Sequence, residues 1–184
     1  MPPGICYGAT DLPLAADPAP HAEALGPLLP AGAPVYSSPL QRCLGLAELL
    51  HPAPIVDHRL REIDFGDWEM RPWDDLDRSQ LDAWASDPWG FTPPGGEAVA
   101  ALRKRVAAFL AGAPEQAVLV THGGVIKVCA ALLAGEDDWF GLTFAYGSLT
   151  LIENGVRRAV WPPRDARSSA ARDKCRNPAA PSPR

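Results

Sequence analysis

The fold is decided by residues 117–124, AVLVTHGG, and by residues 125–135, VIKVCAALLAG, which follow them. The apolar run predicts a buried strand, the Gly-Gly pair a sharp turn, and the next segment a helix that ends at Gly135. His122 then lies at the carboxyl end of a strand, beside a helix N-terminus whose free N–H groups favour an anion. A phosphate would suit this position, although an ordinary strand-to-helix turn is the simpler interpretation of this stretch alone.

A second strand-loop-helix unit is predicted at residues 34–50. Ser38-Pro39 is typical of a helix start, with Ser38 as the N-cap and Pro39 at the first helical position. Arg42 lies in the first turn, where its charge would repel the helix dipole unless an anion lay between them. Taken alone, Arg42 would be interpreted as a solvated surface residue. Because the unit repeats the arrangement at His122, both side chains become candidates for one anion site.

Residues 58–69 alternate charged and apolar side chains, which predicts an extended segment with one face in water. This run contains four carboxylates: Glu62, Asp64, Asp67 and Glu69. Any of them could act as a general acid if burial or a nearby phosphate raised its pKa. Such a run is more often only a solvated face.

The other helices are predicted at residues 19–29, within 68–91, and from Glu97 to Gly112. The middle segment contains four of the six tryptophans and predicts a cap of short helices, whose aromatic rings pack together or line a pocket for a flat ligand. In the last helix, residues 103–105 (Arg-Lys-Arg) are expected largely outside, and Glu97 complements the helix dipole.

A β-hairpin is predicted near the C-terminal end, with strands at 148–153 and 156–161 joined by Asn154-Gly155. We expect this antiparallel pair to end a mostly parallel sheet. Residues 162–184 contain almost no large apolar residue and are expected to be a disordered tail. The prediction is therefore one mixed α/β domain over residues 1–161, followed by that tail.

Composition excludes several classes of partner. The 184 residues have a net charge of -5 and no basic run, which argues against nucleic acid and anionic membranes as partners. Four scattered cysteines without a Cys-x-x-Cys motif indicate neither a disulfide framework nor a metal site. With no leader and no apolar run of about 20 residues, we expect a cytoplasmic protein with reduced thiols.

Five motifs, in order, carry a resemblance to a known family. They are residues 6–14 (Cys-Tyr-Gly-x-Thr-Asp-x-Pro-Leu), 37–42 (Ser-Ser-Pro-Leu-x-Arg), 60–69 (Leu-Arg-Glu-x-x-x-Gly-x-Trp-Glu), 94–97 (Pro-Gly-Gly-Glu) and 121–123 (Thr-His-Gly). Together they resemble the histidine phosphatase superfamily, with its three-layer α/β/α fold like that of phosphoglycerate mutase. The resemblance covers about residues 4–161 and looks strongest toward the alpha-ribazole-5'-phosphate phosphatase branch.

The resemblance implies a cofactor-independent phosphomonoesterase that acts on a small phosphorylated metabolite in cobalamin biosynthesis. Arg42 resembles the family's phosphate-clamping arginine, Glu62 its proton donor, and His122 the histidine that stabilises the transferring phosphoryl group. Substrate contacts are expected from the matching motif residues Tyr7, Gly8, Ser38 and Gly123. A phosphate binder without catalysis, or a mutase or sugar-phosphate phosphatase, remains an alternative.

One family motif has no counterpart in the sequence. Family members begin with a strand ending in Arg-His-Gly, whose histidine becomes phosphorylated, whereas residues 1–184 contain no Arg-His-Gly. We therefore expect the nucleophile and the first central strand to be missing, which would leave an exposed apolar slot beside residues 118–120. The chain as written is expected to be inactive or impaired, and an extended form to carry that strand.

Overall fold

Three short parallel strands form the central sheet of the computed structural model, which describes residues 4–162. Their order is β2 (Ile55–Val56), β1 (Val35–Ser37) and β3 (Val118–Val120). Because all three run in the same direction, the segments that leave β1 and β3 begin at the same edge of the sheet. The site predicted from the sequence lies at this edge.

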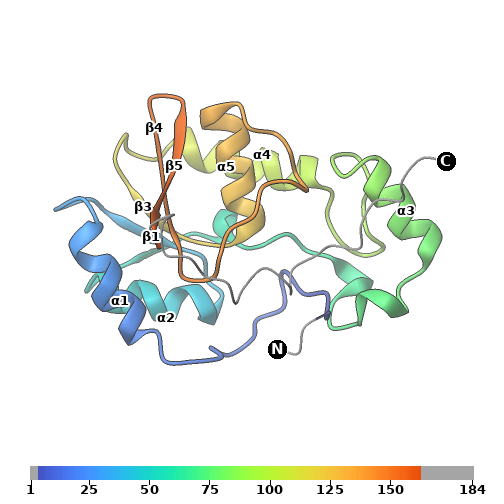
Figure 1. Ribbon diagram of the computed structural model, residues 1–184, viewed down its shortest axis with the longest axis horizontal. Helices are drawn as coiled ribbons and strands as arrows, with labels where there is room; N and C mark the ends of the chain where they lie inside the picture. The colour runs from blue at the N-terminus through green and yellow to red at the C-terminus, as the bar shows by residue number, and fades with distance from the viewer. Residues whose placement is uncertain (1–3, 163–184) are drawn as a thin grey trace.

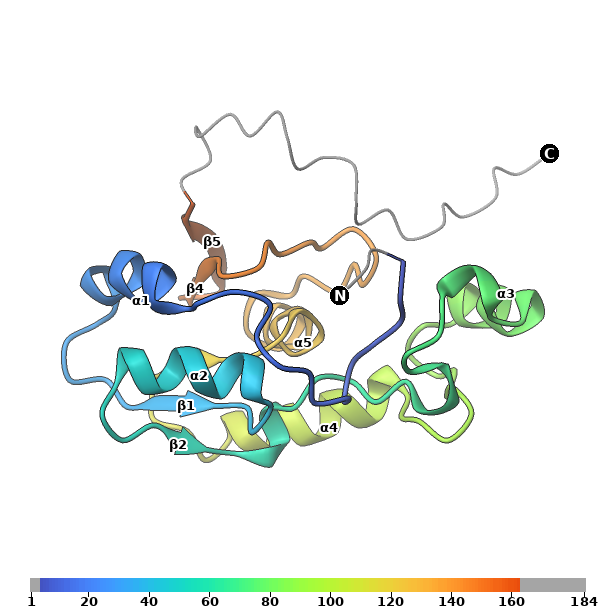
Figure 2. The same cartoon turned by 90° about the horizontal axis from the view of Figure 1, so that it is seen from below.

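The two faces of the sheet are covered by different helices (Figures 1 and 2). Val35 packs with Cys43 and Ala47 of α2 (Gln41–Leu50), whereas the neighbouring Tyr36 has its ring 5.2 Å from that of Phe109 in α4 (Val99–Leu110). Successive strand residues point to opposite faces, so this alternation places α2 on one side and α4 on the other. The three-layer mixed α/β architecture is confirmed.

Strands β1 and β3 pair directly, without a strand between them. Val35 is paired with Val118 and Ser37 with Val120, and the ladder continues where the Ser38 amide donates to the Val120 carbonyl at 3.0 Å. The far edge of β3 pairs with no strand within residues 4–162, as expected if a strand is missing there, whereas the near edge of β3 faces β1. Its backbone groups there are satisfied by β1, and Val120 is buried.

The predicted helices are present, with shifted starts. α1 (Ala19–Leu25) continues into a 3-10 turn at Gly26–Leu28, and α5 (Gly123–Ala134) ends at Gly135 as predicted, where φ is 68° and the backbone is left-handed. α5 begins at Gly123, so the Gly-Gly pair is the first helical turn and not a loop. None of the helices within residues 4–162 has the length and apolar character needed to cross a membrane.

The predicted N-cap of α2 is wrong. The helix begins at Gln41, three residues after Ser38, and Ser38 Oγ accepts only a 3.3 Å bond from the Leu40 amide. Asp11 takes the capping role, because its Oδ1 accepts from the Gln41 amide at 2.8 Å. Ser38 is fully buried and has a different partner.

The predicted extended segment at 58–69 is also wrong. It contains 3-10 turns at His58–Leu60 and Gly66–Trp68, and the buried residues Leu60, Ile63 and Phe65 do not alternate. The carbonyl groups of residues 60 and 61 accept from the side chains of Thr121 and Arg105, and the segment contributes no strand to the sheet.

The cap is built from α3 (Arg78–Ser86) and short turns around an aromatic cluster. Trp73 stacks on Trp84 with centroids 5.7 Å apart, and Trp68 stacks on Phe91 at the same distance. Mutual packing, one of the two predicted roles for these rings, is observed, and Trp68 also lines a cavity in the cap.

The hairpin forms where it was predicted. β4 (Leu149–Glu153) and β5 (Val156–Trp161) are antiparallel, and both turn residues, Asn154 and Gly155, have positive φ as a tight hairpin requires. It is a separate two-stranded sheet beside α5 and does not continue the parallel sheet. The predicted tail, from residue 163 onward, lies outside the described residues.

Candidate functional site

His122 and Ser38 meet where the two strand-loop-helix units leave the sheet. Each follows its strand, and His122 is the residue that precedes the first turn of α5. His122 Nε2 lies 2.8 Å from Ser38 Oγ and 3.5 Å from the Sγ of Cys43. All three side chains are buried. The sequence therefore identified both units correctly, and the structure joins them through this hydrogen bond.

The His122 ring is neutral in this environment. It is 7% exposed, and burial together with the nearby Arg42 and Arg105 cations lowers the pKa of His122 from 6.5 to about 3. A neutral imidazole leaves one ring nitrogen as a donor and the other as an acceptor. A phosphate between His122 and the cations would reduce the repulsion that keeps the ring neutral.

Arg42 is not a solvated surface residue. Its Nη1 donates to the Thr10 carbonyl at 2.8 Å and its Nη2 to the Gly8 carbonyl, while the guanidinium lies 5.7 Å from the centroid of the Tyr7 ring. These contacts tie it to the loop at 7–10, which contains two of the predicted substrate contacts. A guanidinium has five N–H donors, so a phosphate could share Arg42 with the loop.

Glu69 holds the same loop from the other side. Its carboxylate accepts from the amides of Gly8 at 3.1 Å, Ala9 at 2.9 Å, Thr10 at 3.0 Å and Phe65 at 3.0 Å. Burial opposes ionisation, but bonds from Thr10, Gly8 and Phe65 together lower the pKa of Glu69 below its usual range. A carboxylate held ionised in this way is poorly suited to donate a proton, so its role is to anchor the loop.

Among the four carboxylates of residues 58–69, Glu62 is the one whose side chain contacts α5. Its Oε2 accepts from the Gly124 amide at 3.0 Å, two residues after His122, and its Oε1 from the Ile63 amide at 3.0 Å. Burial raises the pKa of Glu62, although both amides and the cations Arg42 and Arg105 oppose the shift. A carboxyl with a raised pKa beside a bound phosphate suits a general acid.

The other two carboxylates of the run lie elsewhere. Asp64 accepts from the Gly66 amide at 2.9 Å and closes a local turn. Asp67 lines a separate cavity in the cap. Of the four carboxylates in the run, only Glu62 bonds to α5 beside His122.

The glycines at the start of α5 differ in the space around them. A Cβ on Gly124 would lie 2.3 Å from Glu62 Oε1, whereas a Cβ on Gly123 would meet no atom within 4 Å. Gly124 therefore permits the approach of Glu62, and Gly123 borders open space. Gly8 is buried, and a Cβ there would lie 2.0 Å from the Ile63 carbonyl oxygen.

The sequence reasoning missed Arg105. Arg103 and Lys104 are exposed as expected, but the Arg105 side chain is 22% exposed and forms an ion pair with Glu97 at 2.6 Å. Glu97 precedes α4, which begins at Val99, so its role as a first-turn residue was also wrong. Arg105 lies three residues after Leu102 and four before Phe109, both buried, and this helical spacing could have identified it.

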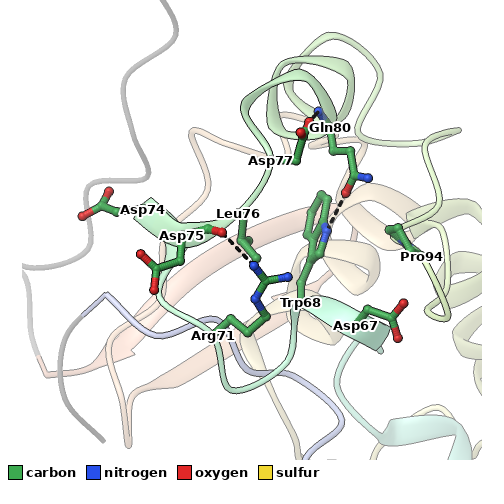
Figure 3. A pocket seen from close by; sticks show the side chains of 9 residues that line it. All are labelled: Asp67, Trp68, Arg71, Asp74, Asp75, Leu76, Asp77, Gln80 and Pro94. Carbon is green, nitrogen blue, oxygen red and sulfur yellow. Dashed lines mark hydrogen bonds between the residues drawn. The ribbon is translucent and has the colours of Figure 1, made fainter.

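A cavity of about 490 Å³ lies in the cap, apart from Arg42, Glu62 and His122 (Figure 3). Its lining residues are Asp67, Trp68, Arg71, Asp74, Asp75, Leu76, Asp77, Gln80 and Pro94. Four carboxylates against one arginine make it a poor site for a phosphate. Within residues 4–162, no cluster of three His, Cys, Asp or Glu side chains could hold a metal ion.

Three proteins of known name are similar in sequence to parts of this chain. The adenosylcobalamin/alpha-ribazole phosphatase of Salmonella typhimurium is 30% identical over 154 residues, which cover 70% of this chain and 75% of that protein. The Escherichia coli protein of the same name is 34% identical over 55% of this chain and 56% of its own length. A Hydrogenobacter thermophilus relative with a phosphoserine phosphatase name is 30% identical, and the match spans only 59% of it.

Solved structures with the same fold carry two kinds of name. A phosphoglycerate mutase from Thermus thermophilus is 40% identical with a TM-score of 0.66, over 88% of this chain and 86% of that one. An alpha-ribazole-5'-P phosphatase structure from Escherichia coli is 27% identical with a TM-score of 0.70, over 85% and 86%. The family model of the histidine phosphatase superfamily, branch 1, matches residues 3–161. Because this family model matches more than half of the chain, the chain belongs to the histidine phosphatase superfamily.

Proposed function

We propose that the chain binds the phosphate group of a small phosphate ester at the edge where β1 and β3 end, and that this ester is of the kind on which an alpha-ribazole-5'-phosphate phosphatase of cobalamin biosynthesis acts. The observation that carries the proposal is the convergence of Glu62 and Ser38 on His122 and the start of α5. His122 and Arg42 would hold the phosphate, and Glu62 would protonate the leaving oxygen as the P–O bond breaks. The names of two relatives support the substrate.

The phosphoryl group needs an acceptor, which in the family is the histidine of Arg-His-Gly. His21, His51 and His58 lack that context, and the motif does not occur in residues 1–184. We therefore propose that this chain binds phosphate esters and that hydrolysis requires a form carrying the Arg-His-Gly strand. The buried free thiols of Cys6, Cys43 and Cys129 support a cytoplasmic location.

Isothermal titration with inorganic phosphate and orthovanadate tests the site. Arg42→Ala and His122→Ala should each weaken binding by about 1.5–3 kcal/mol, the loss of one charge-assisted hydrogen bond. Arg78→Ala, which removes an exposed arginine paired with Asp82, should leave binding unchanged. No binding by the parent, or equal binding by Arg42→Ala, would show that the site is wrongly assigned.

A parallel assay for phosphate release separates the alternatives. Alpha-ribazole 5'-phosphate, 3-phosphoglycerate and phosphoserine should be compared with nitrophenyl phosphate, because the relatives bear phosphatase and mutase names. Binding without release is the expected result for residues 1–184. Turnover by this chain would require another nucleophile and would contradict the proposal.

A further inference from the structure

The main chain that carries Glu62 is held by two side chains from other elements. Arg105 Nη1 donates to the carbonyl oxygens of residues 59 and 61 at 2.6 and 2.7 Å, and its Nη2 to that of Glu62 at 3.0 Å. Thr121 Oγ1 donates to the carbonyl of residue 60 at 2.8 Å. Four consecutive carbonyl groups, from residue 59 to Glu62 itself, are thus fixed on both sides of the Glu62 side chain.

Glu97 orients the guanidinium of Arg105. Its Oε1 accepts from Arg105 Nη2 at 2.6 Å and its Oε2 from Arg105 Nε at 3.3 Å, which is a two-point contact. Glu97 Oε1 also accepts from the Asp64 amide at 3.2 Å, and the Glu97 amide donates to the Asp64 carbonyl at 2.8 Å. Such a planar fork fixes direction as well as charge, which a lysine cannot do.

The hydrogen bond from Gly124 to Glu62 reports where the carboxyl lies. Gly124 is the second residue of α5, and a helix leaves the amides of its first turn without intrahelical partners. Glu62 Oε2 accepts this amide at 3.0 Å. Protection of the Gly124 amide from solvent exchange therefore depends on the position of Glu62.

We propose that Arg105 is a positioning residue that holds the Glu62 carboxyl against the N-terminus of α5, by clamping the carbonyl groups of residues 59–62 in an orientation set by Glu97. The inference rests on the proposed function only where it treats Glu62 as the acid. Arg105 itself is placed to touch main chain and not substrate. Its effect on catalysis would pass through Glu62.

Amide exchange by NMR tests the clamp in the absence of phosphate. Arg105→Lys keeps the charge but loses the fork, so the Gly124 amide should exchange at least ~10-fold faster while Val128, inside α5, is unchanged. The pKa of Glu62, followed through its carboxyl 13C shift, should rise because the carboxylate loses the Gly124 donor. Lys104→Gln, an exposed neighbour on α4, should alter neither quantity.

A purely structural role for Arg105 would give a different result. Arg105→Lys would then lower the melting temperature, or accelerate Gly124 and Val128 alike, with the Glu62 pKa unchanged, and this outcome would overturn the proposal. If Arg105→Lys does not fold, Glu97→Gln tests the same geometry with the same two readouts. If the parent does not bind phosphate, the proposed function is refuted, but the amide-exchange result still tests the role of Arg105. The failure of the proposed function and the failure of the Arg105 proposal can therefore be distinguished.

Discussion

The two strand-loop-helix units, β1–α2 and β3–α5, both have a carboxylate bonded at the helix N-terminus, but the two carboxylates lie in different surroundings. Each helix receives a carboxylate from a distant segment at its N-terminus: Asp11 accepts from Gln41 at 2.8 Å, and Glu62 from Gly124 at 3.0 Å. Asp11 is exposed, whereas the carboxyl of Glu62 is shielded from water enough for burial to raise its pKa. The first contact is an ordinary helix cap.

The two carboxylates differ in their exposure to water at the N-termini of α2 and α5. Asp11 is exposed to water. Glu62 is drawn toward the neutral form by burial and toward the ionised form by two amides and two cations. A carboxyl balanced in this way can change protonation when a phosphate arrives. The comparison therefore separates a structural cap from a carboxyl that is proposed to act as an acid.

The largest expected difference between the units is their response to acid. Since the folded chain holds His122 neutral down to about pH 3, the unfolded chain alone binds its proton below the ordinary value of 6.5. This contribution is constant above pH 6.5. Stability should fall as pH drops from 6.5 toward 3, by up to about 1.4 kcal/mol per pH unit. Urea unfolding across this range measures the slope, and His122→Gln should flatten it.

The raised pKa of Glu62 opposes part of this predicted loss of stability in acid. Glu62 acts in the opposite direction, because its raised folded pKa gives stability that is present below its ordinary value of 4.5 and lost as pH rises through the folded value. Equal slopes in the parent and in His122→Gln would contradict a neutral, buried His122.

Two adjacent glycines provide a sharper test of the α5 end. Gly124→Ala places a methyl group 2.3 Å from Glu62 Oε1, so the carboxyl must move and lose its amide bond, at a cost of about 1–3 kcal/mol. Gly123→Ala meets no atom within 4 Å and should be neutral or stabilising by up to ~1 kcal/mol. Chemical denaturation of both variants gives the comparison. Equal destabilisation would mean that Glu62 does not occupy this space.

The smallest effect is expected at the exposed cap of α2. Asp11→Ala should cost about 0.5–1 kcal/mol, because the Gln41 amide can bond to water instead. Glu48→Ala, an exposed site later in the same helix, serves as the control and should change the melting temperature less. A loss as large as that of Gly124→Ala would remove the distinction between the two ends.

The sequence predicted those parts of the site that depend on neighbouring residues. Each strand-loop-helix unit spans few residues, so periodicity and glycine placement located Arg42 and His122 without a structure. The run at 58–69 was harder. The residue pattern does not distinguish its four carboxylates, and only the resemblance to the family pointed to Glu62. Contacts across the fold then place Glu62 at Gly124 and Glu69 at the loop of residues 8–10.

Arg105 and the cap of α2 show where local patterns fail. The acceptors of Arg105 lie up to 46 residues away, so the Arg-Lys-Arg run looks like one solvated face. Ser38 has the residue type of an N-cap, but His122 takes its hydroxyl and Asp11 takes the amide it would have bonded. In both cases the side chain bonds to a partner that is distant in sequence, so the local pattern gives the wrong prediction.

The direct pairing of β1 with β3 has a consequence for the order of folding. Val35 and Val118 are partners in the ladder but lie roughly eighty residues apart in the chain, so closing the sheet costs more loop entropy than forming any helix. Ser38 and His122 sit at the ends of these strands and meet only when the sheet closes. The anion site is therefore expected late in folding, and a nascent chain that has not reached residue 120 would carry Arg42 without the histidine beside it.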